Sequence, residues 1–136
     1  MIDKWVICGS RAKGKEKLEA YRKLVFKTLN EAYWNERAVM SKNEVYQLDI
    51  IEGCCKDSAD EFAEEWADAN EHSLPHFPAT KGGYLRRNLR MINQNPSQVI
   101  AFWNGFSLGT AHTIALATMK HIPVKIIMIN KLNVDD

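Results

Sequence analysis

The chain lacks the features by which several classes of protein are recognised from sequence. It has three cysteines in 136 residues, an odd number and too few for the disulfide framework of a secreted domain. No apolar run reaches the roughly 20 residues that a membrane-spanning helix needs, and the N-terminus carries no signal-peptide pattern. We therefore expect a cytoplasmic protein that does not contact a membrane.

Metal-binding patterns and an excess of charge are also missing. There is no Cys-x-x-Cys or His-Glu-x-x-His and the four histidines are scattered, so we expect neither a metal site nor a cofactor. Lys and Arg number 18 against 17 Asp and Glu, a net charge of +1. Because nucleic-acid-binding domains usually carry a clear basic excess, we do not expect a nucleic-acid partner.

The hydrophobic fraction of 46% is ordinary for a globular protein. The length fits a single domain over residues 1–136, with residues 130–136 expected to form a loose tail. Short apolar runs predict strands at residues 5–8, 45–51, 74–77, 99–103 and 124–129. Helical periodicity predicts helices at residues 18–32, 57–70, 84–93 and 107–120.

This alternation of strands and helices predicts an α/β fold. We expect a three-layer, Rossmann-like architecture with a mostly parallel five-stranded sheet and helices on both faces. The third strand is weakened by Pro75 and Pro78, whereas the last is expected to be buried. If the strand order is 3-2-1-4-5, the loops after the first and fourth strands flank the point where that order reverses, which is where such sheets bind ligands.

Those two loops are the richest in small and hydroxyl residues. Gly9, Ser10 and Arg11 follow the first strand; glycine permits close approach to the backbone, and arginine can hold a phosphate or carboxylate with two hydrogen bonds. The alternative for this loop is a turn glycine beside a solvated arginine.

The loop after the fourth strand contains Gly105, Ser107, Gly109 and Thr110. It opens a helix, whose free N–H groups and dipole favour an anion. It is not a P-loop, because the Gly-Lys-[Ser/Thr] ending is absent. The alternative is a plain strand-to-helix turn with Ser107 as N-cap.

Two further segments offer charged side chains. In Arg86-Arg87-Asn88 the two arginines point in different directions on a helix, so one can enter a cleft while the other is solvated. The segment from Gly53 to Asp60 supplies carboxylates. Asp60 could bind a ribose hydroxyl or act as a general base, or it could only favour the first turn of a helix through the dipole.

Taken together and in this order, the four segments resemble the SLOG superfamily of Rossmann-like nucleotide-ligand domains, in particular its small stand-alone branch related to YspA/YpsA. The resemblance covers about residues 5–129. It is carried by Gly9-Ser10-Arg11, Gly53 through Asp60, Arg87-Asn88-x-x-Met91, and Ala101 through His112.

The resemblance implies a pocket for a nucleotide or nucleotide-derived molecule. Gly109 and Thr110 would contact phosphate, Arg87 and Asn88 would face the ligand, and Arg11 would close the pocket. It also implies a homo-oligomer and is typical of phage and bacterial proteins.

A related branch, the LOG phosphoribohydrolases, shares the Arg-Asn-x-x-Met and Gly-Thr motifs and splits the N-glycosidic bond of nucleoside monophosphates. Its loop reads Pro-Gly-Gly-x-Gly-Thr-x-x-Glu, but here Thr113 stands in place of the glutamate and the Pro-Gly-Gly is not matched. Glycosidic cleavage through an oxocarbenium-like transition state needs a carboxylate. No catalytic residue is therefore assigned. Asp57, Asp60 or His112 could substitute, and Asp60 and His112 are the candidates we retain.

Three functions remain open. The first is a module that senses, carries or sequesters a nucleotide-derived molecule, and the missing glutamate favours it. The second is an N-glycosidic bond hydrolase of nucleoside monophosphates. The third is a DNA-processing accessory protein, by analogy with DNA-processing relatives of the superfamily, which the near-neutral charge disfavours.

Overall fold

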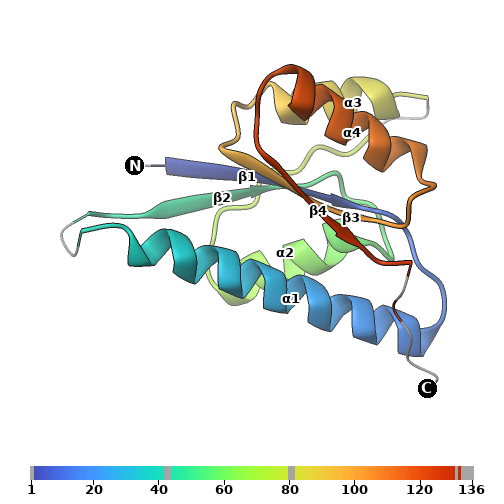
Figure 1. Cartoon of the computed structure of the whole chain (residues 1–136), viewed down its shortest axis with the longest axis horizontal. Helices are drawn as coiled ribbons and strands as arrows, with labels where there is room; N and C mark the ends of the chain where they lie inside the picture. The colour runs from blue at the N-terminus through green and yellow to red at the C-terminus, as the bar shows by residue number, and fades with distance from the viewer. Residues whose placement is uncertain (1, 42–43, 80–81, 131, 133–136) are drawn as a thin grey trace.

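A parallel sheet lies between two pairs of helices in the computed structural model, which describes residues 2–41, 44–79, 82–130 and 132 (Figure 1). Helices α1 and α2 cover one face, and α3 and α4 cover the other. The elements are β1 (Ile2–Gly9), α1 (Lys15–Ala38), β2 (Gln47–Ile51), α2 (Ala59–Ala69), α3 (Tyr84–Ile92), β3 (Gln98–Trp103), α4 (Leu108–Met119) and β4 (Val124–Met128). The predicted three-layer, Rossmann-like α/β class is confirmed.

The described residues form a sheet of four strands in the order β2-β1-β3-β4, with every neighbouring pair parallel. The expectation of five strands is wrong. The segment around residues 74–77 makes only two isolated parallel bridges to the β2 edge, Asp49 with Ser73 and Glu52 with His76. Pro75 and Pro78 have no N–H group to donate, which explains why pairing at this edge does not continue.

Alternate residues of the two central strands enter different cores. Trp5 and Ile7 of β1 pack with α1 and α2, whereas Val6 and Cys8 pack with α3 and α4. The same alternation on β3 leaves its central residues, Val99–Phe102, fully buried. Strands buried on both faces read as continuous apolar runs, which is why the sequence located these two strands well.

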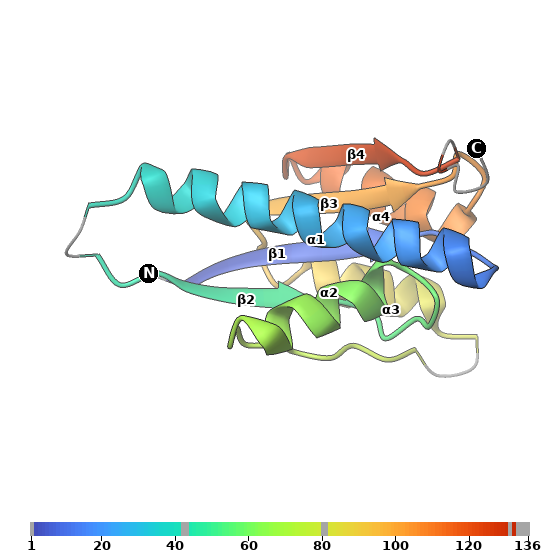
Figure 2. The same ribbon diagram turned by 90° about the horizontal axis from the view of Figure 1, so that it is seen from below.

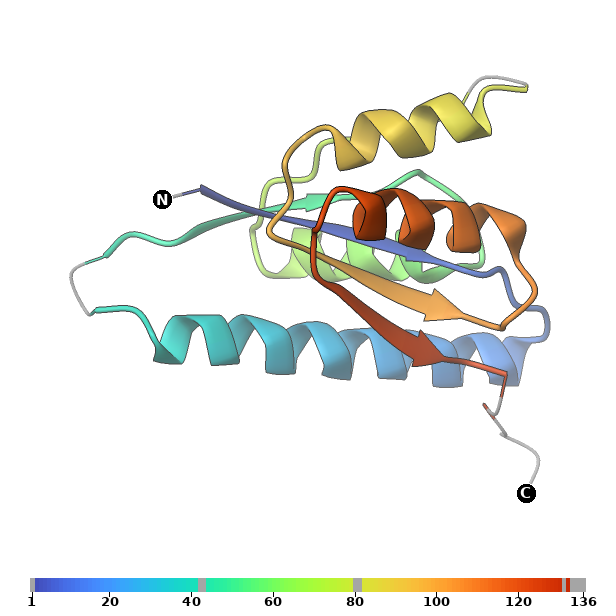
Figure 3. The ribbon, with the colours of Figure 1, turned by 45° about the horizontal axis from the view of Figure 1, so that its top comes forward.

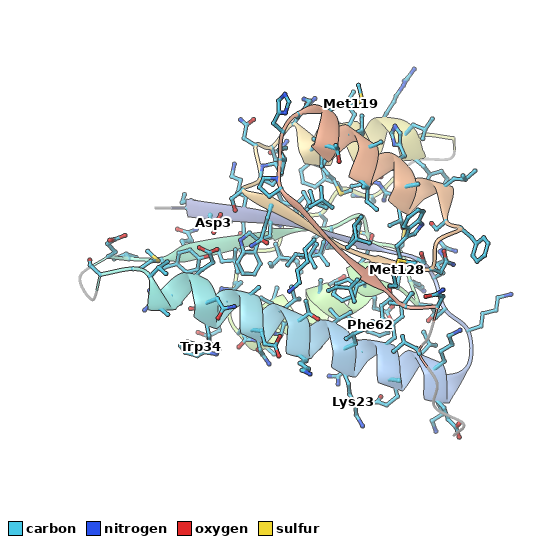
Figure 4. All side chains as sticks on the ribbon, in the orientation of Figure 1. Asp3, Lys23, Trp34, Phe62, Met119 and Met128 are labelled. Carbon is cyan, nitrogen blue, oxygen red and sulfur yellow. The ribbon has the colours of Figure 1, made fainter. Side chains whose placement is uncertain are left out.

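The last strand was expected to be buried, and this prediction is wrong. β4 is an edge strand, and the side chains of Ile126 and Met128 are 45% and 46% exposed. Figure 4 shows Met128 on this outer strand. An apolar run indicates that a strand tends to be buried. It does not show whether the strand lies at the edge of the sheet, where it has a neighbouring strand on one side only.

Helix α1 has 24 residues and runs along the whole face of the sheet (Figure 2). Tyr21, Val25 and Leu29 on its inner side are fully buried, as their spacing predicted, whereas Trp34 is 66% exposed near its end. None of the helices in the described ranges is long and apolar enough to cross a membrane. The predicted tail lies mostly outside the described residues, although Leu132 packs against the core below α1 and α2.

Tyr21 holds the loops after β1 and β2 together. Its hydroxyl donates to the carbonyl oxygen of Ser10 at 2.9 Å and accepts the N–H of Ala59 at 3.1 Å. Ser10 extends this link, because its Oγ accepts the N–H of Asn104 at 3.0 Å. Gly9 must lack a side chain here, since a Cβ would lie 2.7 Å from Ala59 Cβ and 2.9 Å from the carbonyl oxygen of Phe102.

We expect Tyr21→Phe to lower the free energy of unfolding by about 1–3 kcal/mol, because it leaves a buried donor and a buried acceptor without a partner. Urea denaturation measures the change. Tyr33→Phe is the matched control, since the Tyr33 hydroxyl makes no hydrogen bond to a residue within the described ranges. Equal losses in the two variants would contradict a linking role for Tyr21.

Candidate functional site

A pocket of about 520 Å³ opens at the carboxyl ends of β1 and β3, where the strand order reverses. Figure 3 shows β1, β3 and β4 pointing toward the same end of the molecule. The pocket is lined by Cys8, Gly9, Arg11, Cys55, Asp60, Tyr84, Leu85, Arg87, Asn88, Met91, Asn104, Ser107, Leu108, Gly109, Thr110 and Thr113. Its position is the one predicted for an open α/β sheet.

The N-terminus of α4 forms one wall of the pocket. Asn104 Oδ1 accepts the N–H groups of Phe106 and Ser107 at 2.8 and 2.9 Å, which turns the chain into the helix. Ser107 is the N-cap and accepts the N–H of Thr110 at 3.4 Å. The N–H groups of Leu108 and Gly109 have no partner among the described residues, so this helix end can still bind an anion.

A buried arginine forms the opposite wall. Arg87 of α3 is 6% exposed; its Nε donates to Asn88 Oδ1 at 2.9 Å and its Nη1 donates to the carbonyl oxygen of Gly53. A Cβ on Gly53 would lie 2.6 Å from Arg87 Cζ and 3.0 Å from Asp60 Oδ2. Glycine at position 53 is therefore what lets the guanidinium lie against the backbone after β2.

Asp60 lies in the first turn of α2, beside this arginine. Its Oδ2 accepts the N–H groups of Gly53 at 3.0 Å and Cys55 at 3.4 Å. Burial, and then the charge of Glu52, raise the pKa of Asp60 from its ordinary value of 3.8 to about 6, against the lowering effect of Arg87 and the backbone N–H groups. Asp60 Oδ1 has no hydrogen-bond partner in the described part of the chain and is available to a ligand.

Asn88 connects α3 to α4. Its Nδ2 donates to the carbonyl oxygen of Gly109 at 3.3 Å and lies 3.2 Å from Nδ1 of His112. Thr113 is buried in the pocket wall, and its hydroxyl donates to the same carbonyl at 3.3 Å. His112 does not line the pocket.

The structure places the predicted ligand-binding residues unequally. Those that line the pocket are Gly9, Arg11, Asp60, Arg87, Asn88, Ser107, Gly109 and Thr110. Gly53 lines a smaller neighbouring cavity of about 140 Å³. Ser10 and Gly105 line neither, because Ser10 is buried as a link between loops and Gly105, with φ at +85°, shapes the turn before α4.

The two adjacent arginines follow the predicted division, with Arg87 buried and Arg86 exposed. The main residue that sequence reasoning missed is Glu52, which follows β2 and is completely buried. It accepts the N–H of Cys54 at 2.6 Å and lies 2.8 Å from Nδ1 of His76. The sequence signal that could have identified Glu52 is an acidic residue directly after a buried apolar strand.

Comparison of the chain with the models of known protein families, with curated proteins and with solved structures finds no match. The arguments for function therefore rest on the geometry of the pocket and on the motifs in the sequence.

The pKa of Asp60 predicts a pH-dependent stability. The folded carboxyl holds its proton up to about pH 6, whereas the unfolded one releases it near 3.8. The folded state therefore binds more protons in this window, and raising the pH through it lowers the free energy of unfolding. Asp60→Asn removes the effect, so we expect the variant to gain up to about 3 kcal/mol relative to wild type between those pH values. Urea denaturation at several pH values measures the free energy of unfolding of both proteins. A constant difference between them over this pH range would show that Asp60 ionises normally.

Proposed function

We propose that this chain binds a nucleotide or nucleotide-derived small molecule in the pocket at the carboxyl ends of β1 and β3, as a sensor, carrier or sequestering module. The observation that carries the proposal is that Leu108 and Gly109, at the start of α4, line the pocket and that their N–H groups have no partner among the described residues. The volume of about 520 Å³ falls in the range of small-molecule sites. The resemblance to SLOG domains supports the same ligand class.

The parts of the ligand can be assigned to different walls. A phosphate suits the N–H groups of α4, where the helix dipole adds to the hydrogen bonds. Arg11 is exposed, lines the pocket and makes no hydrogen bond or ion pair with any described residue, so it is free to contact the same anion. Asp60 Oδ1 suits a sugar hydroxyl on the opposite wall.

Arg87 contributes mainly positive charge and shape. Its Nε and Nη1 are already hydrogen-bonded to the protein, and Nη2 lies 4.0 Å from Cys55 Sγ. Replacing Arg87 would also unpair groups buried beside it. A loss of ligand binding in such a variant would therefore not distinguish a direct contact from a disturbed wall.

N-glycosidic bond hydrolysis is the second candidate, and one observation favours it. Asp60 is a carboxyl group in the pocket whose pKa is raised to about 6, which is the range of a general acid or base. Thr113 argues for the binding module, because its hydroxyl is directed to a backbone carbonyl and offers no carboxylate to the sugar.

Gly109→Asp is the sharpest test of binding. A Cβ at position 109 would meet nothing within 4 Å, and an acid in the first turn stabilises a helix, so the fold should be preserved. The new carboxylate would repel an anion and compete for the same N–H groups. We expect binding of AMP or ADP-ribose to weaken by about 1.5–3 kcal/mol, the scale of a charge-assisted hydrogen bond. Isothermal titration calorimetry measures the affinity.

Ala115→Asp is the matched control, because it adds the same charge to an exposed position of α4 away from the pocket. Unchanged affinity in Gly109→Asp, or an equal loss in both variants, would refute a phosphate site at this helix end. Native mass spectrometry of the same samples reports the oligomeric state, which we propose to be a homo-oligomer. Release of free base and ribose phosphate from AMP would favour the hydrolase instead.

A further inference from the structure

Three side chains of different chemistry converge beside the pocket, on the outer edge of β2. Glu52 directly follows the strand, Cys54 comes two residues later, and His76 comes from the segment that bridges to this edge. One ligand atom from each lies within 4.8 Å of the other two. Glu52 is completely buried, whereas the thiol of Cys54 is exposed and the His76 side chain is 46% exposed. The cluster therefore combines a fixed carboxylate with two ligands that solvent can reach.

The backbone holds these groups in place. Cys54 has φ at +61°, a conformation that non-glycine residues rarely adopt, and its N–H donates to Glu52 Oε2 at 2.6 Å. The N–H of Phe77 donates to the carbonyl oxygen of Glu52 at 3.2 Å, which aligns the neighbouring His76 with the strand. His76 belongs to the connection between α2 and α3, and its bridge to Glu52 fixes that connection at the edge of the sheet.

The arrangement does not suit a cysteine nucleophile with a histidine base. In a catalytic triad, one ring nitrogen of the histidine contacts the nucleophile and the other contacts the acid. Here Cys54 Sγ lies 3.4 Å from His76 Nδ1, and Glu52 Oε1 lies 2.8 Å from that same nitrogen. The three atoms surround a common point instead of forming a relay.

The distances fit a shared ion. With Zn–S near 2.3 Å and Zn–N and Zn–O near 2.0–2.2 Å, a tetrahedral zinc ion separates its ligand atoms by about 3.4–3.6 Å. The Sγ–Nδ1 and Sγ–Oε1 separations are both 3.4 Å. Only the Nδ1–Oε1 pair, at 2.8 Å, must open by roughly 0.6 Å to reach that geometry. A small rotation of the half-exposed imidazole supplies this movement.

We propose that Glu52, Cys54 and His76 form a binding site for a thiophilic divalent transition metal of the zinc type, with the fourth position open to water or another ligand. A thiolate, an imidazole and a carboxylate are the donors that Zn²⁺ takes in proteins, and the thiolate selects against Mg²⁺ and Ca²⁺. On binding, the thiol proton leaves to solvent and the imidazole coordinates through Nδ1 with its proton on Nε2. The two negative charges of thiolate and carboxylate then balance the charge of the ion.

The site adjoins the nucleotide pocket but does not coincide with it. Cys54 lines the smaller cavity of about 140 Å³, which shares Arg11, Cys55, Tyr84 and Arg87 with the main pocket. The proposal goes beyond the proposed function and does not depend on it, because metal binding can be measured without a nucleotide.

Co²⁺ is the probe of choice, since a cobalt–thiolate bond gives a charge-transfer band in the near ultraviolet. We expect the reduced protein to develop this band with one equivalent of Co²⁺ and to lose it when Zn²⁺ is added. Cys54→Ser should abolish the band. His76→Gln should weaken Co²⁺ binding at least about tenfold. Losing a residue that only supports a metal ligand already costs about that much affinity, and His76 is proposed as a ligand itself.

The controls are Cys55→Ser, which removes the adjacent thiol, and His121→Gln, which removes an exposed imidazole elsewhere. Both should keep the band and the wild-type affinity. Circular dichroism checks that each variant is folded. We expect the Cys54 and His76 variants to fold, because both residues are exposed. The proposal fails if wild type gives no band, if Cys54→Ser keeps it, or if Cys55→Ser loses it.

Discussion

The geometry of the pocket depends on the hydrogen bonds that the buried guanidinium of Arg87 makes within the protein. A buried charge is costly unless it is paired and hydrogen-bonded, and here the carbonyl oxygen of Gly53 and Asn88 Oδ1 accept its protons while Asp60 supplies the opposite charge. Because Gly53 has no Cβ, the loop after β2 can approach α3 closely enough for this pairing. The loop after β2 is thereby held against α3.

A second set of links aligns the loops at the carboxyl ends of the strands. Tyr21 joins the loop after β1 to the start of α2, and Ser10 joins it to the loop after β3. Other polar groups of the pocket wall, such as Arg87 Nε and Asn88 Nδ2, are hydrogen-bonded within the protein. Groups without a hydrogen-bond partner among the described residues include the N–H groups of Leu108 and Gly109, the Arg11 side chain and one oxygen of Asp60. These groups could accept an anion on one side and a hydroxyl on the other, which is why we propose a nucleotide-derived ligand.

Much of the fold and part of the site could be predicted from the sequence. The central strands and all four helices were located because burial periodicity is a local property of the chain. The edges of the sheet were not predicted correctly. Pro75 and Pro78 reduce the expected third strand to two isolated bridges, and β4 is an edge strand with a neighbour on one side only. Most motif residues line one pocket, whereas Ser10 is buried outside its lining and its hydroxyl accepts the N–H of Asn104.

The sequence alone contains the residue types, their spacing and the alternation of strand and helix. These properties determined the α/β class and the two loops that meet at the switch point. They also indicated that one arginine of a pair is buried. Which groups stay unpartnered was decided only by the tertiary structure. The same holds for the meeting of Glu52 and Cys54 with His76, more than twenty residues away. Such contacts depend on which segments become neighbours across the sheet edge, and that is decided by packing of the whole chain, since no local pattern of residues encodes a distance between segments.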